Sequence, residues 1–330
     1  MEEFKAYRIH QDGKSVHARF EDRTLRDLGN RPVLVRVRYS GINFKDALAA
    51  TGAGKILRSF PLTGGIDLAG DVVESSDTRF HVGQTVLVTG CGLGEEVDGG
   101  YSEYARVDGD WVIPIPEGFD ARDAMTLGTA GFTAALAIHR MERNGQNPER
   151  GPVVVTGASG GVGSVAVDML AGAGYEVIAI SGKKNAASWL RQIGADKVLD
   201  RNEVEFGARP METALWGGAI DNVGGDMLAW LTRTVNWWGN IASVGLAGSH
   251  ELHTTVMPFI LRGVSILGIN SVKTARDERK QVWARIASDL RPRHLDAIRT
   301  SEIDFAELPG AFEDFLGGRV RGRTVVRINA

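Results

Sequence analysis

The middle of the chain alternates short, continuous apolar runs with segments of helical composition. An unbroken apolar run of this length is typical of a strand that is buried on both faces of a sheet. Such runs occur at 152–156, 176–180, 197–199, 219–223, 240–244 and 264–269. Helices are predicted between them, the first two over 162–173 and 185–193. Strand alternating with helix in this way predicts a doubly wound parallel sheet of about six strands.

The first third of the chain has a different pattern. The segment 33–39 shows partial two-residue alternation, and 71–74 and 84–88 are short runs rich in β-branched residues. Glycine pairs at 64–65 and 99–100 mark turns between them. Short strands with irregular turns favour a barrel-like β unit over a layered α/β unit.

Three segments lie outside these two patterns. Residues 121–143 are helical in composition, rich in Ala, Met and Leu. From about residue 275 the chain returns to a helix and ends in a short strand, 323–328. Trp237 and Trp238 precede the fifth strand of the parallel series and are interpreted as packing residues.

Composition and charge exclude several classes of protein. The chain has 330 residues, 43% of them hydrophobic and 24% charged, which suits a globular protein of two domains and not a disordered one. Its net charge of −3 gives no global attraction to nucleic acid or to an anionic membrane. The single cysteine, Cys91, excludes an internal disulfide and a multi-cysteine zinc site. A charged start, Met1–Ala6, and the lack of a long apolar stretch predict a cytoplasmic protein.

A glycine-rich turn, Thr156–Gly163, follows the first buried strand and opens a helix. In that position the backbone N–H groups and the helix N-terminus form a site for a pyrophosphate. The strict G-x-G-x-x-G spacing is met only in part, because Ala158 occupies the first glycine position and Gly160 and Gly163 the other two. Within the alternating strand–helix pattern the turn predicts dinucleotide binding. The residues expected to contact the cofactor here are Ser159, Gly160, Gly161 and Val162.

The residues after the second buried strand bear on the choice of cofactor. Proteins that bind NAD in this way commonly end that strand with an acid that holds the ribose hydroxyls. Here Ser181, Gly182, Lys183 and Lys184 follow, with no carboxylate to repel a 2′-phosphate. NADPH is therefore preferred to NADH. Arg201, after the third strand, is either a second phosphate contact or a surface arginine.

Seven motifs, in order along nearly the whole chain, resemble those of one family. They are Gly41–Leu48, Pro61–Gly70, Gly99–Ala105, Gly128–Ala134, the glycine-rich turn, Thr255–Arg262 and Gly322–Thr324. With these motifs the chain resembles the zinc-free medium-chain dehydrogenases/reductases of the quinone-oxidoreductase-like branch. Within that branch it is most similar to the acryloyl-CoA reductases.

The resemblance implies an α/β fold, with a GroES-like β-barrel catalytic domain and a Rossmann domain built on a doubly wound parallel sheet. The expected domains are 1–125 for the first part of the catalytic domain, 126–270 for the Rossmann NADP-binding domain, and 271–330 for the return to the catalytic domain. The active site would lie in the cleft. Members are commonly homodimers, often pairing the edge strand near 264–269.

The resemblance also implies a reaction. Zinc-dependent relatives have Gly-His-Glu where this chain has Gly65-Ile66-Asp67, and isoleucine cannot bind a metal. Without a Lewis acid, the easier reaction is hydride addition to an already activated C=C bond. The expected activity is NADPH-dependent reduction of a short enoyl-CoA, acryloyl-CoA to propanoyl-CoA, with the hydride added to the β-carbon. No metal, nucleic-acid or membrane partner is expected.

Site residues follow from the motifs. Asn43 and Lys45 are candidates to face the nicotinamide and the substrate oxygen, and Phe44 to pack near the nicotinamide ribose. Arg323 is expected either to reach the cofactor or substrate carbonyl or to anchor the C-terminal strand. The acids Asp46 and Asp67 are interpreted as structural, and the donor of the α-carbon proton is left open. The remaining expected cofactor contacts are Thr129, Leu246, Ile260 and Ser271.

Two other functions stay open. The first is an NADPH quinone or 2-alkenal reductase on the same scaffold, which would accept free enones and not need CoA. The second is a protein that binds NADPH with little turnover, as some crystallin-type relatives do. Nothing in the sequence favours this second alternative, because the motifs of the cleft are intact.

Overall fold

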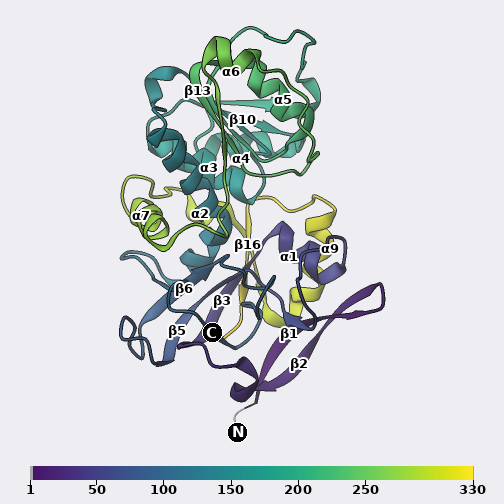
Figure 1. Ribbon diagram of the computed structural model, residues 1–330, viewed down its shortest axis with the longest axis vertical. Coiled ribbons are helices and arrows are strands. Elements are labelled where there is room, and N and C mark those ends of the chain that lie inside the picture. The colour runs from purple at the N-terminus through teal and green to yellow at the C-terminus, as the bar shows by residue number, and fades with distance from the viewer. Residues whose placement is uncertain (1–2, 330) are drawn as a thin grey trace. The chain divides into compact units, whose positions relative to one another are not determined.

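The computed structural model describes residues 3–329, whose helices and strands are drawn in Figure 1. These residues form two compact units. Unit 1 runs to Thr129 and includes Val272–Lys280 and the described residues from Arg299 onward, while unit 2 comprises Ala130–Ser271 and Gln281–Ile298. Residues 281–298, which the sequence-based boundaries group with the catalytic domain, cluster with unit 2.

The sheet of unit 2 is fully parallel. Its six strands follow the order β11-β10-β9-β12-β13-β14, so the order reverses between β9 and β12. The strands are β9 (Val153–Thr156), β10 (Val177–Ser181), β11 (Lys197–Asp200), β12 (Trp216–Asp221), β13 (Val235–Ser243) and β14 (Ser265–Gly268). All of β9 is buried, as its continuous apolar run predicts. The predicted doubly wound sheet is confirmed, with its topological switch point beside β9.

Short helices connect these strands. The helices that lie within unit 2 include α3 (Gly161–Gly172), α4 (Ala187–Gln192), α5 (Gly225–Thr234), α6 (Met257–Arg262) and α8 (Leu295–Ile298), with 3-10 turns η2 (Pro148–Arg150), η3 (Lys184–Ala186) and η4 (Arg201–Glu203). α3 buries eight of its twelve residues, which explains its almost entirely apolar and small-residue sequence.

Unit 1 contains a seven-stranded sheet and a three-stranded sheet. The larger has the order β15-β16-β3-β5-β6-β8, with β7 also paired to β3, and the smaller has the order β2-β1-β4. The strands are β1 (Glu3–Asp12), β2 (Ser15–Thr24), β3 (Val33–Ile42), β4 (Leu62–Thr63), β5 (Asp67–Ser75), β6 (Thr85–Thr89), β7 (Tyr104–Val107), β8 (Ile113–Pro114), β15 (Arg299–Asp304) and β16 (Arg323–Arg327). The C-terminal β16 lies beside β3 of the N-terminal part, as Figure 1 shows.

The sequence pattern does not predict the hairpin of β1 and β2, which pair over ten residues each. None of the residues of β2 is buried, and its sequence is rich in charged side chains. A strand without a buried face lacks the two-residue alternation on which prediction depends. Also in unit 1 are α1 (Phe44–Thr51), α9 (Leu308–Leu316), η1 (Leu25–Leu28) and η5 (Phe305–Glu307), while α7 (Arg276–Ile286) continues from unit 1 into unit 2.

The helical character expected of residues 121–143 is confirmed, with one break. α2 (Ala121–Arg143) is interrupted at Gly128, whose φ of 51° and ψ of −154° are not helical. Only glycine adopts this conformation readily, because it lacks a Cβ. The segments on both sides of Gly128 are helical in composition. Composition alone therefore does not indicate the break.

Trp237 and Trp238, interpreted as packing residues, each contact a neighbour but are not part of the core. Their side chains are 58% and 66% exposed on β13. Trp238 has a φ of 61°, and its ring lies against Gly263, where an added Cβ would approach within 2.6 Å of it. An exposed pair of indoles beside an edge strand is a feature of a contact surface.

Candidate active site

The glycine-rich turn of unit 2 joins β9 to α3. A Cβ added at Gly163 would lie 2.4 Å from the carbonyl oxygen of Gly157, so only glycine allows the helix to pack this closely on the turn. Gly157 itself has a φ of 58°, in the left-handed region. α3 begins at Gly161, and the N–H groups of its first turn have no acceptor within the helix. Together with Ser159, Gly160 and Val162, this turn has the chemistry to hold an anion.

Two residues that sequence reasoning missed hold this turn in place. At the end of β12, Asp221 accepts hydrogen bonds from Thr156 Oγ1 at 2.6 Å and from the Gly224 N–H at 2.8 Å. Asn222 donates from Nδ2 to the carbonyl oxygen of Thr156 at 2.8 Å. Burial raises the pKa of Asp221. The signal that could have found them is a polar pair directly after an apolar strand, at the edge where a doubly wound sheet binds ligands.

The end of β10 carries a cluster of donors next to the turn. Ser181 Oγ donates to Ser159 Oγ at 2.9 Å, and the Lys183 N–H donates to Ser181 Oγ at 3.1 Å. The guanidinium of Arg201 lies over Gly182, where an added Cβ would come within 3.0 Å of Arg201 Cζ. The structure therefore brings all five of these sequence-predicted residues together. Hydroxyl and cationic donors without an acid among them suit a phosphate ester.

The other predicted cofactor contacts of unit 2 are more dispersed. Leu246, 67% exposed, lies beside the turn after β12, because a Cβ added at Gly224 would be 3.4 Å from its Cα. Ile260 is on α6 and is 72% exposed, and Ser271 follows β14 and is partly buried. Their contact with a cofactor stays a prediction.

In unit 1 a buried polar cluster surrounds Asn43, at the start of α1. Asn43 Nδ2 donates to Asp67 Oδ2 at 2.8 Å and to Asp46 Oδ2 at 3.2 Å, while Asn43 Oδ1 accepts from Arg323 Nη1 at 3.1 Å. Both amide hydrogens are therefore directed at carboxylates. Asp46 also accepts from the backbone N–H groups of Asn43 and Ile66, at 2.8 and 2.9 Å, and so caps α1.

Asp67 joins this cluster to Thr129. Its carboxylate accepts from the Thr129 N–H at 2.9 Å and from Thr129 Oγ1 at 2.5 Å. Arg323 donates to the carbonyl oxygens of Thr126 and Ile42, at 2.9 and 3.1 Å, and is 2% exposed. The structure thus brings Asn43, Thr129 and Arg323 together. The arginine contacts are those of an anchor for β16, and a contact with a cofactor stays a prediction.

Burial dominates the electrostatics of the cluster. It raises the pKa of Asp46 to about 7, and the nearby Asp67 carboxylate adds to the effect. Burial also lowers the pKa of Arg323 and raises that of Tyr101, whose hydroxyl donates to the Gly41 carbonyl oxygen at 3.1 Å. Asp46 and Asp67 have the structural role expected of them, because their oxygens are occupied by backbone and side-chain donors.

Phe44 and Lys45 extend from the first turn of α1, outside the buried cluster. The Phe44 side chain is 51% exposed. Lys45 Nζ forms an ion pair with Glu95 Oε1 at 2.9 Å, with side-chain exposures of 34% and 17%. Of the three residues predicted for catalysis, Lys45 is thus partly open to solvent, whereas the functional groups of Asn43 and Arg323 are engaged inside unit 1.

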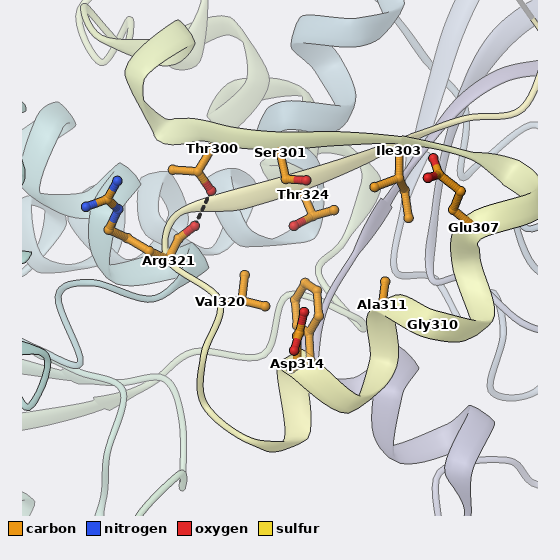
Figure 2. A pocket seen from close by; sticks show the side chains of 11 residues that line it. Thr300, Ser301, Ile303, Glu307, Gly310, Ala311, Asp314, Val320, Arg321 and Thr324 are labelled. Carbon is orange, nitrogen blue, oxygen red and sulfur yellow. Dashed lines mark hydrogen bonds between the residues drawn. The ribbon is translucent and has the colours of Figure 1, made fainter.

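Unit 1 also has a cavity of about 330 Å³ that the sequence did not indicate. Figure 2 shows it between β15, β16 and α9, lined by hydroxyls of Thr300, Ser301 and Thr324. Phe315 of α9 also lines it. The Arg321 side chain points away from it, while the Arg321 carbonyl oxygen accepts from Thr300 Oγ1. None of the sequence-predicted site residues lines this cavity.

Among residues 3–329, no group of three or more His, Cys, Asp and Glu side chains is arranged to hold a metal ion. None of the helices in that part of the chain combines the length and the apolar character needed to cross a bilayer.

Comparison with known proteins identifies the family. Two family models match: "Alcohol dehydrogenase GroES-like domain" over residues 29–117 and "Zinc-binding dehydrogenase" over 161–288. The chain is 48% identical to "Probable acrylyl-CoA reductase AcuI" of Escherichia coli, over 97% of this chain and 98% of that one. It is 46% identical to "Putative quinone oxidoreductase YhfP" of Bacillus subtilis, over 98% and 99%.

Solved structures agree with this assignment. The yhdH oxidoreductase of Salmonella enterica, in complex with NADP, matches with a TM-score of 0.95 and 46% identity, over 98% of this chain and 100% of that one. Bacillus subtilis yhfP, with NAD bound, matches with a TM-score of 0.97 and 46% identity, over 99% and 100%. The predicted GroES-like unit and Rossmann unit are confirmed. The chain belongs to the medium-chain dehydrogenase/reductase family and is an oxidoreductase of its quinone-oxidoreductase-like and acrylyl-CoA-reductase-like branch.

Proposed function

We propose that this protein reduces the activated C=C bond of a short enoyl-CoA thioester, acryloyl-CoA to propanoyl-CoA, with NADPH as reductant. The observation that carries the proposal is the near full-length identity, 48% and 45%, to two proteins named as acrylyl-CoA reductases. The homologous structures with NADP and NADPH bound support the choice of cofactor. So does the cluster of Ser181, Lys183 and Arg201, whose donors suit a 2′-phosphate.

The residues of this chain fit the cofactor and the reaction. The first turn of α3 would bind the pyrophosphate, and Thr129 and Phe44 would lie beside the nicotinamide. When bound, NADPH supplies the hydride, which adds to the β-carbon of the enoyl thioester and leaves negative charge on the thioester oxygen. Preorganised donors lower the free energy of that charged state. Because both Asn43 amide hydrogens are directed at carboxylates, Lys45 is the better donor to this oxygen.

The test is turnover of NADPH, followed by its absorbance, with acryloyl-CoA, crotonyl-CoA, a simple quinone and a 2-alkenal as separate acceptors. We expect the fastest turnover with acryloyl-CoA, and slower turnover when NADH replaces NADPH. Turnover of the quinone or the alkenal without turnover of the thioester would favour the second candidate function. The 46% identity to YhfP is the observation that keeps that candidate open. Tight NADPH binding without turnover of any acceptor would favour a non-catalytic protein.

Removing the cations next to Ser181 is expected to weaken NADPH binding selectively. Lys183→Ala and Arg201→Ala should each raise the KM for NADPH roughly 10-fold, because a hydrogen bond to a charged group contributes about 1.5–3 kcal/mol. The KM for NADH should change less than 2-fold (about 0.4 kcal/mol). Arg191→Ala, an exposed arginine of α4, is the matched control. Equal effects on the two cofactors would contradict the assignment of a 2′-phosphate site.

We also propose a homodimer through the β14 edge of unit 2. β14 is an edge strand of its sheet. Three exposed apolar residues lie on the neighbouring β13 and α6: Trp237, Trp238 and Leu261. Light scattering is expected to give about twice the chain mass of 35.6 kDa. Leu261→Glu should shift the mass to that of one chain, whereas Val82→Glu, at a more exposed apolar residue of unit 1, should not. A wild-type mass of one chain would contradict the proposal.

A further inference from the structure

Lys45 lies where a lysine is electrostatically unfavourable unless it has a partner. It is the second residue of α1, at the end of the helix where the backbone dipoles place partial positive charge. Glu95 is that partner, with its Oε1 at 2.9 Å from Lys45 Nζ. The neighbouring acid of α1, Asp46, does not serve this purpose, because its oxygens accept from the N–H groups of Asn43 and Ile66.

Hydrogen bonds hold the start of α1 in place, and they therefore fix the backbone position of Lys45. Asn43 is the cap of the helix, and its side chain is bound at both ends by Asp46, Asp67 and Arg323. The exposed Phe44 and the half-exposed Lys45 extend from this fixed turn. Glu95, 17% exposed, then restricts the long Lys45 side chain to one direction.

Three other proton-bearing groups lie close to Asn43, and each is buried. The Tyr101 side chain is 1% exposed and its hydroxyl donates to the Gly41 carbonyl oxygen. Asp46 and Asp67 are 2% and 0% exposed. Of these four side chains, Lys45 is the one that is open to a ligand.

We propose that Lys45 donates the proton to the α-carbon and that Glu95 is the positioning residue that orients it. This inference rests on the proposed function. The hydride of NADPH forms the new C–H bond at the β-carbon, and the π electron pair moves toward the α-carbon and the thioester oxygen. The α-carbon then takes a proton from the Lys45 ammonium, whose N–H electron pair stays on nitrogen. Water returns a proton to the neutral amine, which completes the cycle.

Running the reaction in D₂O with unlabelled NADPH tests the donor directly. The product then carries one deuterium at its α-carbon, which becomes a stereocentre. Wild-type protein should give one configuration, because the exchanged Lys45 delivers the deuteron to one face. Lys45→Met should lower kcat by roughly 10²–10⁴-fold and give both configurations, while NADPH still binds as in the wild type.

Lys45→Arg separates proton transfer from charge. Arginine keeps the positive charge and an ion pair with Glu95, but its guanidinium does not release a proton. We expect its KM for the enoyl substrate to stay within about 3-fold (0.7 kcal/mol) of wild type, with kcat and labelling as in Lys45→Met. Wild-type kcat and a single configuration in both variants would overturn the proposal.

Glu95→Gln tests the positioning role. We expect kcat to fall roughly 10-fold, a barrier change of about 1.4 kcal/mol, with partial loss of the single configuration. The matched control is Glu96→Gln, the next residue of the same loop, which pairs with Lys273 at 3.1 Å. It should leave kcat and labelling unchanged. Equal losses in the two variants would show a structural effect of the loop, and no loss in Glu95→Gln would remove Glu95 from the mechanism.

The labelling test does not depend on the thioester. A 2-alkenal also gains a proton at its α-carbon, so it replaces acryloyl-CoA if the wild type reduces only free enones. In that case the proposal of a CoA thioester substrate is contradicted, while the role of Lys45 can still be measured. A wild type that reduces neither acceptor would overturn both.

Discussion

Replacing Gly128 with alanine is expected to lower the free energy of unfolding by roughly 3–5 kcal/mol and to abolish most of the activity. A Cβ at this position would lie 2.6 Å from Asp67 Oδ2 and 3.0 Å from Arg323 Nη2. The backbone adds to the cost, because its φ of 51° and ψ of −154° suit only glycine. The substitution therefore displaces two charged groups that are buried together, one of which holds Thr129.

Chemical denaturation with a paired control measures this effect. Gly174→Ala is the control, since Gly174 has a φ of 83° but no atom within 4 Å of an added Cβ. It should cost about 1 kcal/mol, which is the backbone strain without the displacement. If the two variants lose the same stability, the buried contacts of Gly128 are not what constrains this position.

The stability of the protein is expected to fall as the pH rises toward neutrality, through Asp46. Burial raises the pKa of this carboxyl from 3.8 to about 7, so the folded chain keeps a proton that the unfolded chain loses. Between these two values the folded state binds more protons, and its free energy of unfolding therefore decreases with rising pH. The full effect is roughly 4 kcal/mol, complete once the pH exceeds about 7.

The measurement is urea denaturation at about pH 5 and about pH 8, on either side of most of the change. Asp46→Asn should remove this part of the pH dependence, even though it also weakens the cap of α1 and lowers stability at both values. Glu117→Gln, an exposed acid of unit 1, should keep the wild-type difference. An Asp46→Asn variant with the wild-type difference would show that other groups cause it.

The sequence predicts unit 2 well because its strands are buried on both faces. Val153, Val154 and Val155 form a run that no exposed element would have, and each later strand repeats the pattern. The β1–β2 hairpin has no comparable signal. Its stability depends on pairs between distant residues, such as Arg8 Nη1 with Asp98 Oδ1 at 2.6 Å, and those pairs depend on the fold itself.

The candidate site shows the same limit. The motif containing Asn43 could be located from the sequence, but not the direction of its amide. That direction depends on Asp46 of α1 and also on Asp67 of β5 and Arg323 of β16, which are distant in sequence. The partner of Lys45 lies fifty residues away in sequence, so no spacing indicates Glu95. The role of Asp221 was missed for a related reason. It depends on a contact with Thr156 at the end of β9, which is distant in sequence and lies beside Asp221 only because their strands are neighbours in the sheet.

The place of β16 in its sheet has a consequence for biosynthesis. β16 lies between β15 and β3, and its first residue, Arg323, bonds to Asn43 and Ile42 near the other end of the chain. The ribosome makes residues 130–271 of unit 2 well before it makes this strand, so unit 2 has most of its chain available to fold first. Unit 1 contributes β3 before unit 2 is made, but its larger sheet is completed only by β16, which follows unit 2 in the chain. A ribosome that stalls before residue 323 therefore leaves β3 without β16 and the Asp46–Asp67 pair without its arginine.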